Sequence, residues 1–268
     1  MPDALSFLAL LSGAAFGLLA GAFAAYAYRL LPARWLCDYG QAPAACHARE
    51  ARCLPKCGIA GFAALTALCT VCITAHSAKF ALSMRAGAMG GAPPAPWRIV
   101  TVSLVSACLV AALLLAAWCD FRYTILPDEL LALCAALALA LWALGALRFV
   151  QGTAWYEPFL GAALGFFGLW GVLALAGRIY RTEAMGFGDV KLLCALGVLC
   201  GPRALGVAAA LAVLIAGAVF AVLLARKKLA LRDSVPFGPF LAAGALLAVC
   251  LWPLWCALGT WYLHLFFS

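Results

Sequence analysis

The chain has 268 residues, of which 68% are apolar and only 10% charged, and its formal net charge is +8 at pH 7. A soluble domain carries about a quarter charged residues, so this chain has too few polar side chains to cover a soluble fold. Its Lys and Arg residues flank apolar runs instead of forming a patch, which argues against nucleic-acid binding. The apolar runs approach or exceed the ~20 residues that cross a bilayer as a helix, and backbone in lipid must be hydrogen-bonded internally. The composition therefore predicts an all-α, polytopic integral membrane protein.

Eight membrane spans are expected in chain order. The sixth is the weakest, because it is short and ends at the helix-terminating pair Gly201-Pro202. Only Asp3 precedes the first apolar run, and the absence of a basic segment there predicts an uncleaved span, not a signal peptide. The expected spans lie near residues 5–28, 58–82, 98–119, 129–149, 157–177, 184–200, 204–225 and 236–262.

A segment rich in Gly and Pro, residues 83–97, reads as a flexible connector. It divides an N-terminal two-span unit, residues 1–97, from a C-terminal six-span unit, residues 98–268. With the N-terminus outside, 13 of the 18 Lys and Arg residues fall on inward segments and 5 on outward ones. Because inward loops carry an excess of positive charge, both termini are expected outside.

Two of the ten acidic residues stand directly beside apolar runs on the predicted inward side. Asp120 ends the third span and Asp189 begins the sixth, so the topology places both at similar depth on one face. Inserting a charged side chain at the centre of a membrane helix costs about 2.5–3.5 kcal/mol of free energy. Carboxylates beside hydrocarbon are therefore candidates for a functional role. Glu157, at an outer span edge, is expected at the membrane interface.

Two carboxyl groups that share one site can act as an aspartic protease dyad, because like charges held close share a proton. The ionised member takes a proton from water while the protonated member donates to the scissile carbonyl, and the two titrate as a unit. Gly186 and Gly188 would allow a tight turn and close approach of a substrate backbone. The alternative is that each aspartate is a structural carboxylate paired with Arg122 or Lys191.

Four segments resemble the type IV prepilin peptidase family, membrane aspartic proteases with a GxGD motif. Asp120-Phe-Arg-Tyr-Thr-Ile-Leu-Pro127-Asp128 is similar to the first aspartate motif, and Gly186-Phe-Gly-Asp-Val-Lys-Leu192 to the second. Val235-Pro-Phe-Gly-Pro-Phe240 resembles the opening of the last span, and the segment 21–32 the N-terminal region ending in Arg-Leu-Pro.

The resemblance implies that Asp120 and Asp189 are catalytic, with Lys191 as a motif residue, and that Pro127 and Asp128 structure the loop. It implies cleavage of leader peptides after a Gly, at the cytoplasmic face, from type IV prepilins or the pseudopilins of type II secretion. No cofactor is expected for proteolysis. The expected location is the bacterial inner membrane, and no nucleic-acid partner is expected.

The loop at residues 29–57 departs from the family pattern. Longer members carry two CxxC pairs there, bind zinc and methylate the new N-terminus with S-adenosylmethionine. Here the cysteines are Cys37, Cys46, Cys53 and Cys57, and no two are spaced as CxxC. Four thiolates could hold a tetrahedral zinc, or they could remain free thiols. The spacing leaves both alternatives open and argues against the methyltransferase activity of the longer members.

Two other kinds of membrane protein are alternatives to this interpretation. A presenilin-like intramembrane protease would carry its first aspartate in a Tyr-Asp pair inside a span, whereas Asp120 follows Cys119 at a span end. A transporter would show polar groups at mid-membrane, and a scaffold would need no carboxylate pair. The two motifs on one face favour the leader peptidase.

Overall fold

A computed structural model describes residues 2–36, 56–87, 95–180, 186–227 and 235–267. Every regular element in these residues is helical, which confirms the predicted all-α class. The elements are α1 (Pro2–Leu30), the short 3-10 helix η1 (Ala33–Leu36), α2 (Lys56–Gly87), α3 (Pro96–Tyr123), α4 (Asp128–Ala143), α5 (Arg148–Gln151), α6 (Glu157–Tyr180), α7 (Phe187–Ala225), α8 (Gly238–Cys250) and α9 (Trp252–Phe267).

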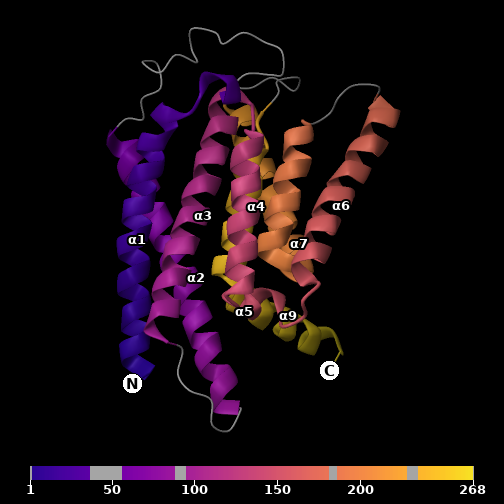
Figure 1. Ribbon diagram of the computed structural model, residues 1–268. Coiled ribbons are helices and arrows are strands. Elements are labelled where there is room, and N and C mark those ends of the chain that lie inside the picture. Colours follow the sequence, from indigo (N-terminus) through magenta and orange to yellow (C-terminus); the bar gives the residue numbers. More distant parts are fainter. Residues whose placement is uncertain (1, 37–55, 88–94, 181–185, 228–234, 268) are drawn as a thin grey trace.

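The predicted count of eight spans is not confirmed. Within the described ranges, five helices are long and apolar enough to cross a membrane, or six if the bent pair α8 and α9 forms one span. Helix α4 has 16 residues, about 24 Å of helix, which is shorter than the ~30 Å hydrocarbon core. Helices α8 and α9 are bent by 76°, and Figure 1 shows α9 lying across the lower end of the bundle.

Helix α7 is broken at the Gly201-Pro202 pair that the sequence indicated as a helix end. Its 39 residues would extend about 58 Å if straight, nearly twice the thickness of the hydrocarbon core. Gly201 has φ 66° and ψ 176°, a conformation that favours glycine and cannot continue a helix. The part before Gly201 packs against α6, where Gly161 meets the backbone of Gly197, and the part after it packs against α8, where Gly244 meets Ala208.

The N-terminal helices pack tightly on each other and on α3. A side chain at Gly17 would collide with the backbone of Ala67, so these small residues let α1 and α2 approach closely. Helix α1 also bonds to α3, because the hydroxyls of Ser12 and Ser103 lie 2.8 Å apart. The two-span unit is therefore packed directly against the helix that carries Asp120.

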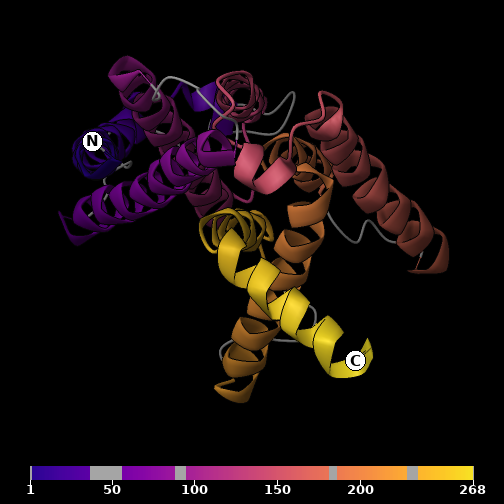
Figure 2. The ribbon, with the colours of Figure 1, turned by 90° about the horizontal axis from the view of Figure 1, so that it is seen from below.

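The two ends of the bundle hold different helix termini. Figure 1 shows that α1 begins and α9 lies at the lower end, while α3 ends and α4 begins at the upper end. Figure 2, seen from below, shows α6, α9 and part of α7 splaying away from the packed centre formed by the other helices. The upper end, where α3 ends and α7 begins, holds the candidate site.

Candidate active site

Asp120 lies in the last turn of α3, and the end of that helix fixes its position. The N–H of Thr124 donates to the carbonyl oxygen of Asp120 at 2.7 Å, and Thr124 itself adopts the left-handed conformation (φ 54°, ψ 30°) that stops the helix. A β-branched residue in this region is strained, so the surrounding structure must hold it there. The chain then turns through an extended Pro127 into α4.

Asp189 lies in the first turn of α7. Gly186 is extended and precedes the helix, and its carbonyl oxygen accepts the N–H of Asp189 at 3.1 Å. A carboxylate in the first turn faces the positive end of the helix dipole, which stabilises its charge. The glycines of this motif thus place an acidic residue at a helix start beside a polar loop.

The two carboxyl groups belong to one site. They are close enough for the charge of Asp120 to act on Asp189. Both side chains are buried, with 5% of Asp120 and 8% of Asp189 exposed, so they are not solvated surface charges. Neither forms an ion pair with a cation in the part of the chain that the structure describes. Two buried carboxyl groups without a countercation are the arrangement in which one proton is shared.

Gly238, the first residue of α8, holds Asp120 in place. Its N–H donates to Oδ2 of Asp120 at 2.9 Å. A Cβ added at Gly238 would lie 2.6 Å from the same oxygen, so only glycine fits. Sequence reasoning matched the Pro-Phe-Gly-Pro segment to the family but gave Gly238 no role. The sequence did indicate such a role, because a glycine between Pro236 and Pro239 suggests that another group of the protein lies close to the backbone there.

Lys191 pairs with Asp128 and not with Asp189. Its Nζ lies 2.8 Å from Oδ1 and 2.7 Å from Oδ2 of Asp128, and 5.4 Å from the ring centre of Phe187. The ion pair joins the two motifs across the site, and each side chain is more than a third exposed. The alternative in which Lys191 neutralises Asp189 is wrong, and the motif cation instead ties α7 to α4.

The two motif glycines differ in their surroundings. A Cβ at Gly188 would meet Cβ of Leu126 at 3.3 Å, so this position packs against the loop that follows Asp120. A Cβ at Gly186 would meet nothing closer than the Gly188 nitrogen at 4.0 Å. Gly188 therefore lets the start of α7 approach the loop that follows Asp120, whereas no described residue crowds Gly186.

Three of the four candidate zinc ligands, Cys37, Cys46 and Cys53, lie outside the described residues. Cys57 is in the first turn of α2, and its side chain is also outside them. Elsewhere in the described ranges, no group of three or more His, Cys, Asp or Glu side chains could hold a metal ion.

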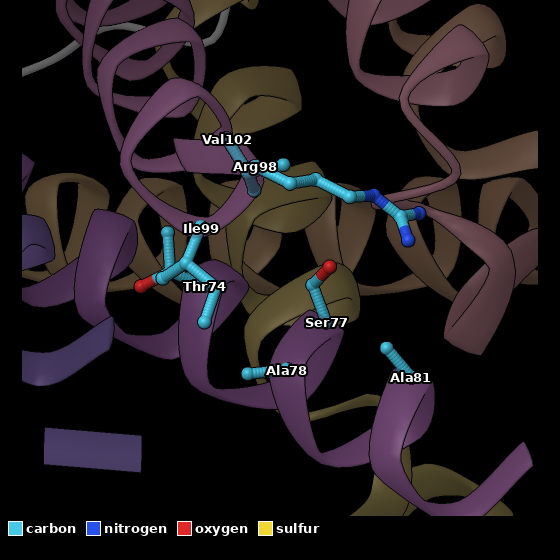
Figure 3. Close-up of a pocket in the computed structure, with 7 residues that line it drawn as sticks. All are labelled: Thr74, Ser77, Ala78, Ala81, Arg98, Ile99 and Val102. Atoms are coloured by element: carbon cyan, nitrogen blue, oxygen red, sulfur yellow. The ribbon is translucent and has the colours of Figure 1, made fainter. Parts of the chain in front are cut away.

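A small cavity lies toward the lower end of the bundle, between α2 and α3 (Figure 3). Its volume is about 20 Å³, enough for roughly one water molecule, and no carboxylate lines it. Arg98 extends from its edge away from Thr74, and the guanidinium donates to the carbonyl oxygen of Leu144 through Nε at 3.0 Å and through Nη2. Arg98 thus satisfies the C-terminal end of α4, and this cavity is structural.

Comparison with known proteins shows the family of the chain. The model of the type IV leader peptidase family matches residues 107–225, a range that contains both aspartates. A prepilin leader peptidase/N-methyltransferase of Burkholderia pseudomallei strain 1026b is 30% identical, over 85% of this chain and 81% of the relative. The chain belongs to the type IV leader peptidase family.

Further relatives of this family match shorter parts. The prepilin leader peptidase/N-methyltransferase of Xanthomonas campestris pv. campestris is 32% identical over 52% of this chain and 46% of the relative. Leader peptidase HopD of Escherichia coli is 44% identical over 31% of this chain and 54% of the relative. No solved structure matches the chain. Membership of the leader peptidase family makes the chain a membrane peptidase and decides against the presenilin-like, transporter and scaffold alternatives.

Proposed function

We propose that this peptidase cleaves the leader peptides of type IV prepilins or of type II secretion pseudopilins, after a Gly, with Asp120 and Asp189 as its catalytic residues. The observation that carries the proposal is the pair of buried, electrostatically interacting carboxyl groups that lack a countercation in the described chain. The printed names of the relatives supply the substrate class, since they are prepilin leader peptidases.

The proposed mechanism needs one water molecule and one shared proton. The ionised carboxylate removes a proton from water, which attacks the scissile carbonyl carbon, while the protonated carboxyl donates to the carbonyl oxygen. Collapse of the tetrahedral intermediate breaks the C–N bond as a proton passes to the leaving amine. Oδ2 of Asp120 accepts the N–H of Gly238. We therefore assign Oδ1 of Asp120 as the oxygen that shares the proton with Asp189.

The proposed site of cleavage is the cytoplasmic edge of an inner membrane. Both aspartates lie at span ends, where water reaches a dyad without a path through lipid, and the surplus of Lys and Arg on this side supports a cytoplasmic orientation. Inserting or deleting three or four apolar residues after the cleavage Gly shifts the scissile bond by about one helical turn, 5.4 Å. Cleavage is expected to fall sharply across such substrates, whereas equal rates would place the chemistry within the bilayer.

The proposal is confined to cleavage and requires no cofactor, because the two carboxyl groups supply both acid and base. The relatives' names pair peptidase with N-methyltransferase, but the cysteine spacing of the 29–57 loop departs from the family pattern. For the loop itself we propose a structural zinc. Metal analysis is then expected to give about one zinc per chain, lost when Cys53 and Cys57 become Ser. A metal-free wild-type protein with full cleavage would leave only free thiols.

The test of the activity is direct product analysis. The purified chain in detergent is incubated with a purified type IV prepilin, and the new N-terminus is determined by mass spectrometry. The expected product begins at the residue after the leader Gly. An intact precursor, or a cut elsewhere, would overturn the proposal.

A further inference from the structure

An apolar groove of about 770 Å³ opens between α2, α3 and α8. Among the described residues, its lining consists of Gly, Ala, Leu, Phe, Trp, Pro and Cys, without a charged or hydroxyl side chain. Large apolar side chains on its rim are left exposed by the described residues: Leu68 is 62% and Phe121 is 63% exposed. A polar ligand would lose its hydrogen bonds in such a groove, so its occupant must be apolar.

One end of the groove adjoins the catalytic aspartates. Its lining includes Phe121, the residue after Asp120, and Pro239, the residue after Gly238. Since the N–H of Gly238 bonds the carboxylate of Asp120, the groove begins where the dyad is positioned. A peptide bound along the groove would therefore continue from this end toward the two carboxyl groups.

The walls of the groove have the spacing of a helix-binding surface. On α2 the lining residues Gly61, Leu65 and Leu68 recur at intervals of four and three residues, which is one face of a helix. On α8 the lining runs from Pro239 to Leu251, about 18 Å along a helix axis. Small residues on both walls allow a further helix to approach closely, as they do between membrane helices.

We propose that this groove receives the apolar helix of the precursor, the segment that follows its scissile bond, and so sets which peptide bond reaches the dyad. This inference rests on the proposed function for its substrate class. Three helical walls fit a fourth helix better than a single lipid chain, and the open end at Asp120 fits an occupant that continues as peptide.

Crosslinking tests occupancy without requiring cleavage. A photoreactive phenylalanine analogue replaces Leu68 on the groove rim in one variant, and Leu214 on α7 outside the groove in the matched control. The two leucines are similarly exposed, at 62% and 68%. Both variants carry Asp189→Asn and are mixed with a purified type IV prepilin in lipid vesicles. The Leu68 position is expected to crosslink to the apolar segment of the prepilin, and the Leu214 position is not. Equal crosslinking at both, or only lipid adducts at Leu68, would overturn the proposal.

Groove filling tests its effect on catalysis. A Cβ added at Gly61 or Gly168 would meet no atom within 4 Å, so Gly61→Phe should fold as well as its control, Gly168→Phe on α6. Gly61→Phe is expected to raise KM for the full prepilin at least tenfold and to leave cleavage of a short peptide that ends before the apolar segment unchanged. Wild-type kinetics on the full prepilin, or equal losses on both substrates, would overturn the proposal. If the wild-type chain cuts neither substrate, the proposed function fails, and the crosslinking experiment alone tests whether the groove binds the prepilin.

Discussion

Helices α1 and α2 pack by the same small-residue contacts as α7 and α8, but the two regions bury different polar groups. Between α1 and α2 the buried polar side chains include Thr66 and Thr70, and each hydroxyl bonds a carbonyl oxygen one turn earlier in its own helix, at 2.7 Å. Around α3, α7 and α8 the buried polar groups include two carboxyl groups, those of Asp120 and Asp189, besides the hydroxyls of α3.

The difference shows why the carboxylates stand out. A hydroxyl can be satisfied within its own helix, so it costs little at a packed interface. The carboxylate of Asp120, in the last turn of its helix, has no such local donor and accepts the N–H of Gly238 from another helix. Burying two such groups in a mainly apolar bundle costs free energy, which indicates that they are kept for function. The N-terminal unit is therefore expected to affect stability, and the C-terminal unit catalysis.

The largest expected effect is loss of cleavage when either aspartate becomes Asn. Asp120→Asn or Asp189→Asn keeps the volume but removes the shared proton, so cleavage should fall below about 1% of wild type. Thermal unfolding in detergent should remain close to that of the wild-type chain. Turnover above a few per cent in either variant would remove that residue from the dyad.

Gly238→Ala is expected to have the next largest effect. The added Cβ would lie 2.6 Å from Oδ2 of Asp120, and displacing a catalytic group by about 1 Å costs roughly 100-fold in rate. Gly206→Ala, where a Cβ meets no atom within 4 Å, is the matched control and should retain full activity. Comparable kcat values in the two variants would show that Gly238 does not position the carboxylate.

Breaking the ion pair between the motifs should have a modest effect. Lys191 and Asp128 are each more than a third exposed, so solvent screening limits their interaction to about 0.5–1 kcal/mol. If that energy holds the site together, Lys191→Met or Asp128→Asn should slow cleavage about two- to fivefold. Steady-state rates of both single variants and the double variant measure the coupling, and strictly additive losses would argue against a working pair.

The smallest expected effect on cleavage lies in the N-terminal unit. The hydroxyls of Tyr28 on α1 and Tyr123 on α3 lie 2.9 Å apart, and Tyr28 is 2% exposed. Tyr28→Phe should lower the free energy of unfolding by about 1 kcal/mol and leave kcat unchanged. Chemical denaturation and cleavage assays measure the two quantities, and a large loss of kcat with unchanged stability would reverse the assigned roles of the two units.

Much of this architecture could be predicted from the sequence. The length of the apolar runs is sufficient to predict helices, because a backbone segment that crosses lipid must form its hydrogen bonds internally. The Gly201-Pro202 pair indicated the break in α7. The number of crossings could not be predicted, because α4 has only 16 residues and the expected sixth and seventh spans form one broken helix, α7. Whether α8 and α9 form one span depends on their 76° bend, which is set by packing and not by composition.

The two aspartates could be selected from the sequence, but their contacts could not. Lys191 lies two residues from Asp189, yet it pairs with Asp128 from another helix. Glu157, expected at the membrane interface, is 6% exposed, and Arg203 from another helix lies 3.8 Å away. Gly238 lies 118 residues from its partner. Such contacts between distant residues are set by how the helices pack, which local sequence patterns do not encode.

The central claim is that Asp120 and Asp189 act as a single catalytic unit, and a double-mutant cycle tests it most directly. Cleavage rates of a type IV prepilin are measured for Asp120→Asn, Asp189→Asn and the double variant, at equal amounts of folded protein. Because groups that act as a unit are non-additive, removing the second aspartate should cause no further loss, and all three residual rates should agree. A double variant that is slower than both single variants by the product of their effects would show that the two carboxyl groups act independently, and would contradict the dyad.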